Sequence, residues 1–132
     1  MLQEPQKKLK PWGHEIWFAH TSSYAGKVLF VKKGHRLSLQ YHEQKTETLF
    51  VFSGKIKFSI GQTEDTLQEK ILEAGMKIDV TPPTIHRAEA LEDSYIFEVS
   101  TPHLEDVVKL ADDYGRTGKG NDEELDSKLS AS

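Results

Sequence analysis

Apolar and polar positions alternate through most of the chain, and this alternation predicts short β-strands. Within residues 55–60, for example, Ile56, Phe58 and Ile60 alternate with polar residues, the pattern of a strand with one buried face. Other segments rich in β-branched or aromatic residues and bounded by glycine or proline turns are residues 15–20, 27–32, 36–42, 47–52, 67–73, 76–80 and 95–100. Many short strands at regular spacing predict an all-β sandwich or barrel.

Helical periodicity is found only near the end of the chain. Thr101 and Pro102 form a helix start, with an N-cap residue followed by proline at the first helical position. The apolar residues that follow repeat at helical spacing: Leu104, Val107, Val108 and Ala111. We therefore expect one short C-terminal helix beside the barrel, ending near Tyr114 and Gly115.

The length of the chain, 132 residues, indicates one domain with one core. Residues 1–10 are polar and are expected to form a flexible N-terminal arm with its basic cluster, Lys7, Lys8 and Lys10, in solvent. Residues 11–116 form the predicted single domain. Residues 117–132 are rich in glycine, serine and acidic side chains, and we expect a disordered acidic tail there.

Charge and composition exclude several classes of protein. The net charge is -4, most of it in the acidic tail, and no basic stripe suggests a nucleic-acid surface. No apolar run reaches bilayer length, and the N-terminus lacks the features of a signal or transit peptide. The chain has no cysteine, which excludes thiolate metal sites and agrees with a cytoplasmic protein. A small-molecule ligand is the expected partner, with no role for nucleic acid or membrane.

Candidate chemistry is concentrated between Gly34 and Gly54. If residues 36–42 are extended, Ser38, Gln40 and His42 share one face of the strand. Glu47, on the next strand, can return to that face. These side chains offer nitrogen and oxygen ligands for a metal ion and would look into a cavity.

The opposite face of the same strand is apolar. Leu37, Leu39 and Tyr41 alternate with the polar residues and must be covered by other atoms. The N-terminal strands or a second copy of the chain could provide that cover. This is the reason to expect a homo-oligomer, most simply a homodimer.

A fourth ligand comes from a rigid turn further along the chain. Pro82 and Pro83 fix the backbone just before His86, which gives this imidazole a defined direction. We predict that one metal ion is held by Gln40, His42, Glu47 and His86. The remaining histidines are expected to be hydrogen-bonded structural residues: His14, His20, His35 and His103.

These residues resemble the two-part signature of the cupin superfamily. Its first motif is matched by Gly34, Gln40, His42, Glu47 and Gly54, and its second by Gly75, Pro82 and His86. More narrowly, the chain is similar to the C-terminal cupin domain of type II mannose-6-phosphate isomerases. The matching segments are Pro11-Trp12-Gly13, Arg36-Leu37-Ser38-Leu39-Gln40, His86-Arg87, Glu98-Val99 and Asp113-Tyr114-Gly115-Arg116.

The resemblance implies a fold, a cofactor and a reaction. The fold is a double-stranded β-helix, or jelly-roll barrel. The cofactor is one divalent metal ion, most commonly zinc, with manganese, iron, nickel or cobalt as alternatives. The reaction is aldose-ketose isomerisation of a phosphorylated hexose, in which a base moves a proton between C2 and C1; the candidates for that base are Glu98, His14 and Lys45.

A sugar phosphate also requires cationic groups to bind its phosphate. Arg87 directly follows the ligand His86 and is a candidate for both catalysis and substrate binding. Arg116, Lys45 and the hydroxyl of Ser38 are further substrate-binding candidates. Arg36 is interpreted as a surface residue.

Three positions depart from the family pattern. Lys45 replaces an expected arginine, Thr84 an expected glycine and Ala90 an expected asparagine. The same four ligands could therefore serve another reaction, such as that of a dioxygenase, a lyase or another sugar isomerase. A non-catalytic sugar-binding module is the third hypothesis.

Overall fold

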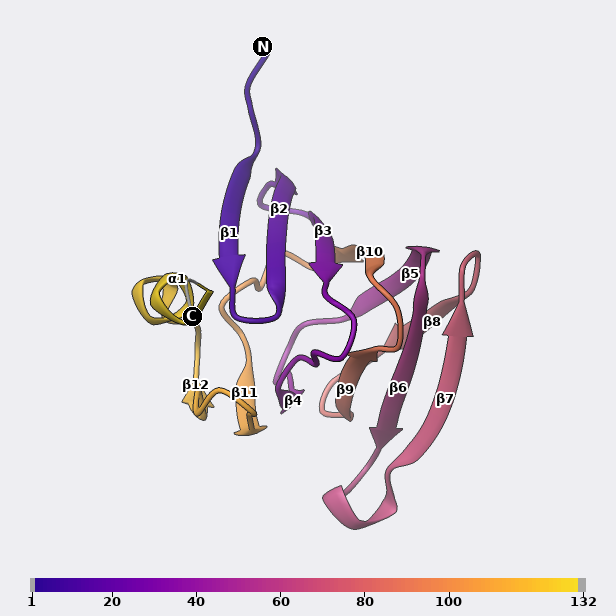
Figure 1. The fold of residues 1–132 in the computed structure, drawn as a ribbon. Helices are drawn as coiled ribbons and strands as arrows, with labels where there is room; N and C mark the ends of the chain where they lie inside the picture. The colour runs from indigo at the N-terminus through magenta and orange to yellow at the C-terminus, as the bar shows by residue number, and fades with distance from the viewer. Residues whose placement is uncertain (1, 131–132) are drawn as a thin grey trace.

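A computed structural model of the chain describes residues 2–130 as two antiparallel sheets that face each other (Figure 1). In spatial order, the first sheet contains β1 (Gln6–Lys10), β2 (Gly13–His20), β3 (Ala25–Val31), β10 (Ser94–Ser100), β5 (Glu47–Ser53) and β8 (Lys77–Val80). The second contains β12 (Gly118–Lys119), β11 (Val108–Ala111), β4 (Leu39–Tyr41), β9 (Ile85–Ala90), β6 (Lys55–Gly61) and β7 (Gln68–Glu73). The all-β prediction is confirmed.

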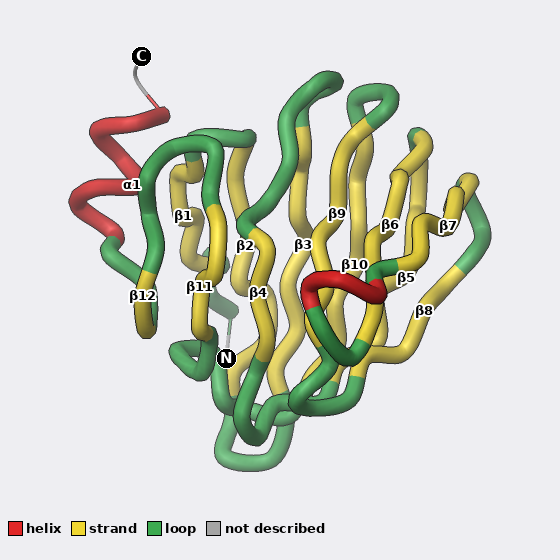
Figure 2. Tube along the Cα trace, turned by 90° about the horizontal axis from the view of Figure 1, so that it is seen from below, coloured by secondary structure: helices red, strands yellow, loops and turns green. Residues whose placement is uncertain are grey.

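Two short helical segments complete the fold. The 3-10 helix η1 (Glu64–Thr66) connects β6 to β7, and the α-helix α1 (Glu123–Ser130) lies beside β1 (Figure 2). In the view of Figure 2 the second sheet is in front and the first sheet is behind it. No helix within residues 2–130 is long and apolar enough to cross a membrane.

The core lies between the two sheets, where alternate residues of each strand point inward. On β3, Leu29 and Val31 are buried, and on β6, Ile56 and Phe58 are buried. The whole core cluster consists of Trp12, Leu29, Val31, Leu49, Val51, Ile56, Phe58, Leu72, Val80, Ala88, Ala90 and Ile96. Burial of each large apolar side chain contributes roughly 1.5–3 kcal/mol, so this cluster is the main source of stability.

The turn from β5 to β6 requires glycine at position 54. Gly54 has a φ of 94°, in the left-handed region that side chains disfavour, and an added Cβ would lie 2.6 Å from the carbonyl oxygen of Asp93. This turn returns the chain from the first sheet to the second. The two sheets thereby enclose the predicted ligands of residues 40–47.

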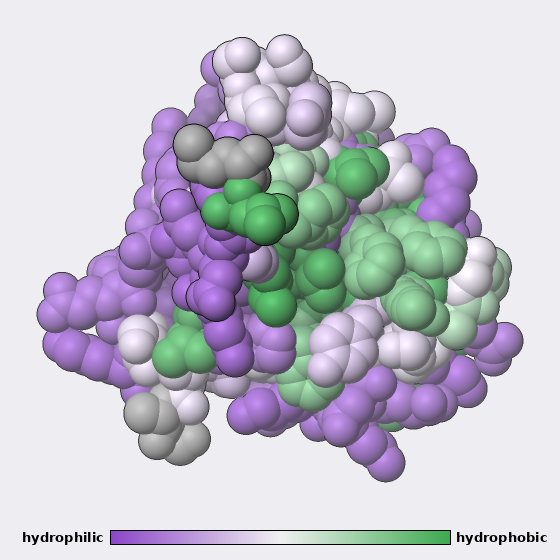
Figure 3. Space-filling view, turned by 90° about the horizontal axis from the view of Figure 1, so that it is seen from above, coloured by the Kyte–Doolittle hydropathy of each residue, from purple (hydrophilic) through white to green (hydrophobic). Residues whose placement is uncertain are grey.

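The outer face of the first sheet carries exposed apolar side chains over its central strands. We define the apolar face as the six residues Phe18, Phe50, Phe52, Tyr95, Phe97 and Val99. The rings of Phe52 and Phe97 stack with centroids 5.0 Å apart. Figure 3, which looks down on this sheet, shows apolar side chains gathered in the middle of the face with hydrophilic residues around them.

The C-terminal helix exists, but its predicted position is wrong. Residues 101–115 form turns and the strand β11, which pairs with β4 and β12 instead of coiling. Leu104 and Val107 are buried in the turns before that strand. Strand pairing and burial at this edge outweigh a helical spacing of only four apolar residues. The observed helix, α1, begins at Glu123.

Both predicted termini are also more structured than expected. Residues 6–10 of the supposed flexible arm form β1, and Lys10 is buried there instead of lying in solvent. Most of the supposed disordered tail forms β12 and α1. Met1 and residues 131–132, the ends of these two segments, lie outside the described residues. The prediction failed because the two termini stabilise each other through polar contacts that have no periodic signature.

Candidate metal centre

Three of the four predicted ligands meet at the core between the sheets. His42 follows β4, Glu47 begins β5, and His86 lies on β9 next to β4, where it pairs with Gln40. All three side chains are buried, and their ligand atoms lie within 4.8 Å of one another. The Oε1 atom of Glu47 is 3.2 Å from Nε2 of His86 and 3.5 Å from Nε2 of His42.

The hydrogen bonds of the two imidazoles leave their Nε2 atoms directed at a common point. Nδ1 of His42 donates to the carbonyl oxygen of Asp106 at 2.6 Å, and Nδ1 of His86 donates to that of Thr84 at 3.0 Å. Since a carbonyl only accepts, each Nδ1 carries the proton and each Nε2 has an available lone pair. Both Nε2 atoms and Oε2 of Glu47 are buried without a hydrogen-bond partner among the described residues.

Two imidazole nitrogens and a carboxylate around one point fit a divalent transition-metal ion. A bound cation would give both Nε2 atoms a partner and would compensate the charge of Glu47, which lowers the cost of burying them. Gln40 lines the cavities on both sides of this group, and its Oε1 accepts a hydrogen bond from Oγ of Ser38 at 2.6 Å. Gln40 as a fourth ligand stays a prediction.

Lys45 lies between two buried carboxylates beside the metal ligands. Its Nζ atom donates to Glu98 at 2.8 Å and lies 3.1 Å from Oε2 of Glu47. Burial lowers the pKa of Lys45, but Glu98 and Glu47 outweigh it and hold that pKa above its ordinary value. Burial raises the pKa of Glu47, but the nearby charge of Lys45 outweighs it and holds that pKa well below the usual range. Lys45 and Glu47 are therefore charged at neutral pH.

A cavity extends from these residues toward β1 and β11. Its walls include Gln40, His42 and Glu98 at one end. Five cationic side chains also line it: Lys10, Lys27, Lys45, Lys109 and Arg116. Such a wall favours an anionic ligand. Leu37 lines the same cavity together with Ser38, so its predicted position on the opposite face of the strand is wrong. Regular alternation begins only at Leu39, the first residue of β4.

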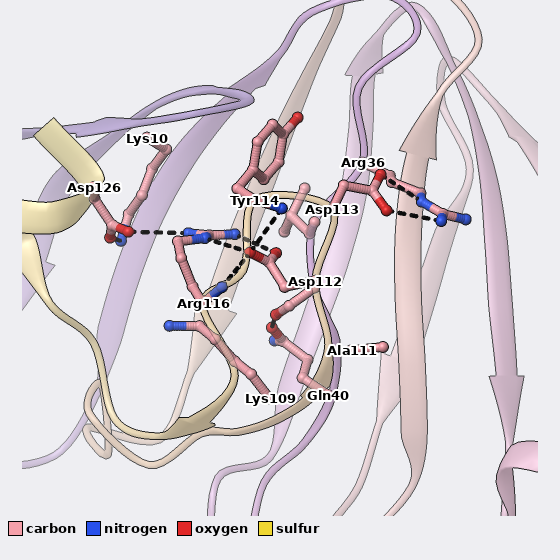
Figure 4. Close-up of polar contacts among 12 residues, drawn as sticks. Lys10, Arg36, Gln40, Lys109, Ala111, Asp112, Asp113, Tyr114, Arg116 and Asp126 are labelled. Carbon is pink, nitrogen blue, oxygen red and sulfur yellow. Dashed lines mark hydrogen bonds and ion pairs between the residues drawn. The ribbon is translucent and has the colours of Figure 1, made fainter. Parts of the chain in front are cut away.

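Arg116 lines this cavity from the loop after β11. Nε and Nη2 of its guanidinium donate to the two oxygens of Asp112 at 2.9 and 2.8 Å, and Nη1 donates to Asp126 at 3.1 Å (Figure 4). Asp126 also accepts from Nζ of Lys10 at 2.7 Å. Arg116 thus belongs to a buried network and not to a helix end, but it lines the cavity as a substrate-binding residue would.

Arg87 is used differently from Arg116. Its Nε atom donates to the carbonyl oxygen of Leu37 at 2.8 Å, and Nη2 donates to that of Ala111 at 3.2 Å. These bonds connect β9 to the segments on either side of β4, so Arg87 has a clear structural role. Its roles in catalysis and substrate binding stay predictions. Arg36 pairs with Asp113 through two bonds of 2.7 and 2.8 Å on the surface, as interpreted (Figure 4).

The structure does not bring His14 to this cavity. Its ring stacks on Phe30 with centroids 5.4 Å apart and lines a separate pocket near Ser127. A proton-shuttle role for His14 would require it on the inner face of β2, where Glu15 lies instead. Three other histidines are hydrogen-bonded, as predicted: His20 to Pro102, His35 to Tyr114 and His103 to Thr101.

Several residues of the cavity were not identified from the sequence. Lys27 could have been identified from the sequence, because strand alternation places it on the same inward face of β3 as Leu29 and Val31. Glu15, which is 3.3 Å from Lys27, is its buried counter-ion. Lys109 and Asp126 had no local signal, because their surroundings come from distant parts of the chain.

The fold, with His42, Glu47 and His86 as a candidate metal site, is that of a cupin-type domain. Residues 1–100 match the family described as mannose-6-phosphate isomerase C-terminal. The match spans most of the chain, and the protein belongs to this family.

Solved structures support the fold. The KdgF protein from Halomonas sp. is 20% identical with a TM-score of 0.64, over 76% of this chain and 87% of that one. An RmlC-like cupin from Shewanella frigidimarina is 16% identical with a TM-score of 0.62, over 76% and 87%. Oxalate decarboxylase from Bacillus subtilis is 15% identical with a TM-score of 0.69, over 80% of this chain and only 30% of that one. No curated protein matches the sequence.

Proposed function

We propose that this protein is a metal-dependent isomerase that interconverts the aldose and ketose forms of a phosphorylated hexose, as mannose-6-phosphate isomerase does. Membership of that family supports the proposal. The observation that carries it is the position of Glu98. This buried carboxylate lines the cavity between the metal ligands and the cationic wall, with its orientation fixed by Lys45.

The residues that would hold the metal ion are His42, Glu47 and His86, with Gln40 as a proposed fourth ligand. When bound there, a divalent ion supplies a Lewis acid that polarises the substrate carbonyl. We favour zinc from the family resemblance. The N and O donors are equally suited to manganese, iron, nickel or cobalt.

Glu98 acts as the base in this proposal. Its carboxylate takes the proton from C2 of the aldose and returns it to C1, while a second proton moves from O2 to O1. All atoms and electrons of the aldose are then present in the ketose. Lys45 holds Glu98 at a fixed position through the 2.8 Å bond and compensates the charge of Glu47. Because the site is buried, competing water is excluded.

The test is isomerisation by the purified, metal-loaded chain. Mannose 6-phosphate deuterated at C2 is supplied in ordinary water, and we expect fructose 6-phosphate that carries deuterium at C1. The variant Glu98→Gln is expected to keep its metal and lose activity by about 10²–10⁴-fold, the usual contribution of a general base. The absence of interconversion with zinc, manganese, iron, nickel and cobalt in turn would refute the proposed reaction.

A second candidate is a metal-dependent reaction on a smaller acid anion. It is favoured by the size of the cavity, about 50 Å³, which is too small to enclose a whole hexose phosphate. The oxalate decarboxylase of similar fold has Mn(II) centres. Turnover of a small dicarboxylate, with none of the sugar phosphate, would support this candidate in the same assay.

We also propose that the protein forms a homodimer through the apolar face. A two-fold interface places the same patch of each copy against the other, and uncharged residues meet their own copies without repulsion. We do not propose the strand face of Leu39 and Tyr41 as the dimer interface, because Leu39 is already buried within a single copy of the chain. Localisation in the cytoplasm stays a prediction.

The dimer is tested by sedimentation of the full chain. Phe52→Lys together with Phe97→Lys is expected to convert the dimer to a monomer. Ile71→Lys is a matched control, because Ile71 is similarly exposed on β7 of the other sheet. A monomeric wild-type protein, or a double variant that remains dimeric, would contradict the proposed interface.

A further inference from the structure

Three cations line the cavity on the side of β1 and β11. We call Lys10, Lys109 and Arg116 the cation cluster; they come from β1, β11 and the loop after β11 (Figure 4). Each has only 6–7% of its surface exposed. All three line the cavity that reaches Gln40 and His42. The cluster is therefore accessible from the proposed active site and shielded from bulk solvent.

The carboxylates around the cluster have different roles. Asp112 binds the Arg116 guanidinium through both oxygens and also accepts the backbone N–H groups of Tyr114 and Arg116, so it is part of the loop itself. Asp126 makes no bond to this loop other than to Arg116. Within residues 2–130 its carboxylate accepts hydrogen bonds from Lys10 and Arg116 alone, and Asp126 is 1% exposed.

Lys109 has no carboxylate within ion-pair distance among the described residues. Its Nζ atom donates to the carbonyl oxygen of Gly120 at 3.0 Å and to the side-chain oxygen of Asn121 at 3.1 Å, both neutral acceptors. Burial and the nearby Arg116 lower the pKa of Lys109. With Asp112 and Asp126 both counted, the cluster still has one more positive than negative charge.

Asp126 reaches the cluster from the helix α1, which is held mainly by charge. Asp126 is the only buried residue of the helix, while its apolar Leu125 is 37% exposed. The two ion pairs to β1 are Lys10 with Asp126 and Lys8 with Glu123. The helix also lies beyond residues 1–100, the part matched by the family. It follows Gly118 and Gly120, whose φ values of 107° and 78° suit a hinge.

Lys10, the partner of Asp126, borders two spaces. The cavity that leads to the metal ligands has a volume of about 50 Å³. A surface pocket of about 240 Å³ lies on the other side of Lys10 and is lined by Asp126, Glu123 and Ser127. Lys10 lines both, so departure of α1 would uncover Lys10 on the side of the surface pocket.

We propose that the cation cluster is a phosphate-binding site that Asp126 occupies as an internal competing anion. A phosphate monoester takes the N–H donors of Lys10 and Arg116, offers further oxygens to Lys109, and displaces α1 toward solvent. The identity of the ligand as a phosphate monoester rests on the proposed function. The exchange replaces one buried anion with another, so the cations stay compensated throughout.

Inorganic phosphate is the probe, measured by calorimetry with the full chain at constant ionic strength. We expect Asp126→Asn, which keeps the shape of the side chain but removes its charge, to bind phosphate about 10-fold more tightly than the wild type, since a competing anion is lost. The matched control is Glu124→Gln, which removes one charge from an exposed part of the same helix. It should leave phosphate affinity unchanged.

A second variant tests whether phosphate binds at the cation cluster. Asp126→Asn combined with Lys10→Met should not show the tighter phosphate binding that is expected for Asp126→Asn alone. Circular dichroism and metal content show that each variant is folded, and measurements with and without metal separate the cluster from phosphate bound at the metal. Equal or weaker phosphate binding by folded Asp126→Asn would overturn the proposal. Because the assay contains no sugar, a lack of isomerase activity would overturn the proposed function and not this site.

Discussion

The two ends of the cavity are built in different ways. At the metal end, Glu47 and His86 lie on strands of the barrel and His42 directly follows β4, and each histidine is oriented by a backbone carbonyl. At the other end, Lys10 and Arg116 are held by Asp126 from a helix with little apolar contact. One cavity can therefore combine metal ligands fixed by the barrel with a cation cluster whose counter-ion, Asp126, comes from a weakly packed helix.

The largest expected effect is that of His86→Ala, which should abolish metal binding without changing phosphate binding. His86→Ala removes one of three ligands, and we expect the loss of stoichiometric metal and a fall in isomerase activity of at least about 10³-fold. Phosphate affinity in the metal-free protein should not change, because His86 does not line the cationic cavity. Metal analysis and calorimetry provide the two readouts.

The control for this experiment is His35→Ala. His35 bonds to Tyr114 and does not contact the metal group, so its variant should retain metal. If His86→Ala kept its metal, the assignment of the ligands would be wrong. If it instead lost phosphate binding in the metal-free state, the two ends would not be independent.

The metal ligands could be predicted from the sequence and the cation cluster could not, because only the ligands are close together along the chain. Gln40, His42 and Glu47 lie within eight residues on two successive strands, so their spacing carries the information. His86 was positioned by a proline turn. By contrast, the contact between Lys10 and Asp126 joins residues 116 positions apart, and neither has a periodic neighbour that marks it. Both were assigned to solvated termini for that reason.

The fold shows the same limit. The strands β2 to β8 and β10 were predicted because alternation and glycine positions are local properties, whereas β1, β11 and β12 were not. The strand β9 was not recognised, although it carries His86, because its residues Ile85–Ala90 mix charged and small side chains. The helical spacing of Leu104 and Val107 was misinterpreted because strand pairing with β4, a non-local interaction, decides the structure there.

The second prediction compares one substitution at both ends. Lys45→Met leaves Glu47 and Glu98 buried without their cation, and we expect a loss of about 3–5 kcal/mol in the free energy of unfolding. Lys109→Met removes a cation whose partners are neutral, so the expected loss is only about 1 kcal/mol. Urea denaturation of the metal-free proteins measures both. Equal losses would show that the two ends do not differ in charge compensation.

The smallest expected effect concerns Glu15, which lies between the two ends and pairs with Lys27 at 3.3 Å. Burial raises the pKa of Glu15, but Lys27 and Lys10 outweigh it and lower that pKa from 4.5 to about 2. A carboxylate with a lowered pKa stabilises the fold above its unfolded pKa. That contribution, roughly 3 kcal/mol at most, is lost as the pH falls from about 4.5 to 2.

The pH dependence of Glu15→Gln isolates this contribution. Its free energy of unfolding, measured by urea denaturation of metal-free protein, should decline less than that of the wild type between pH 5 and pH 2 by roughly 2–3 kcal/mol. Asp65→Asn is the control, since Asp65 is exposed in η1. Parallel pH profiles for wild type and Glu15→Gln would mean that Glu15 is not a charged partner of Lys27. The carboxylate of Glu15 would then not compensate the buried charges of Lys27 and Lys10.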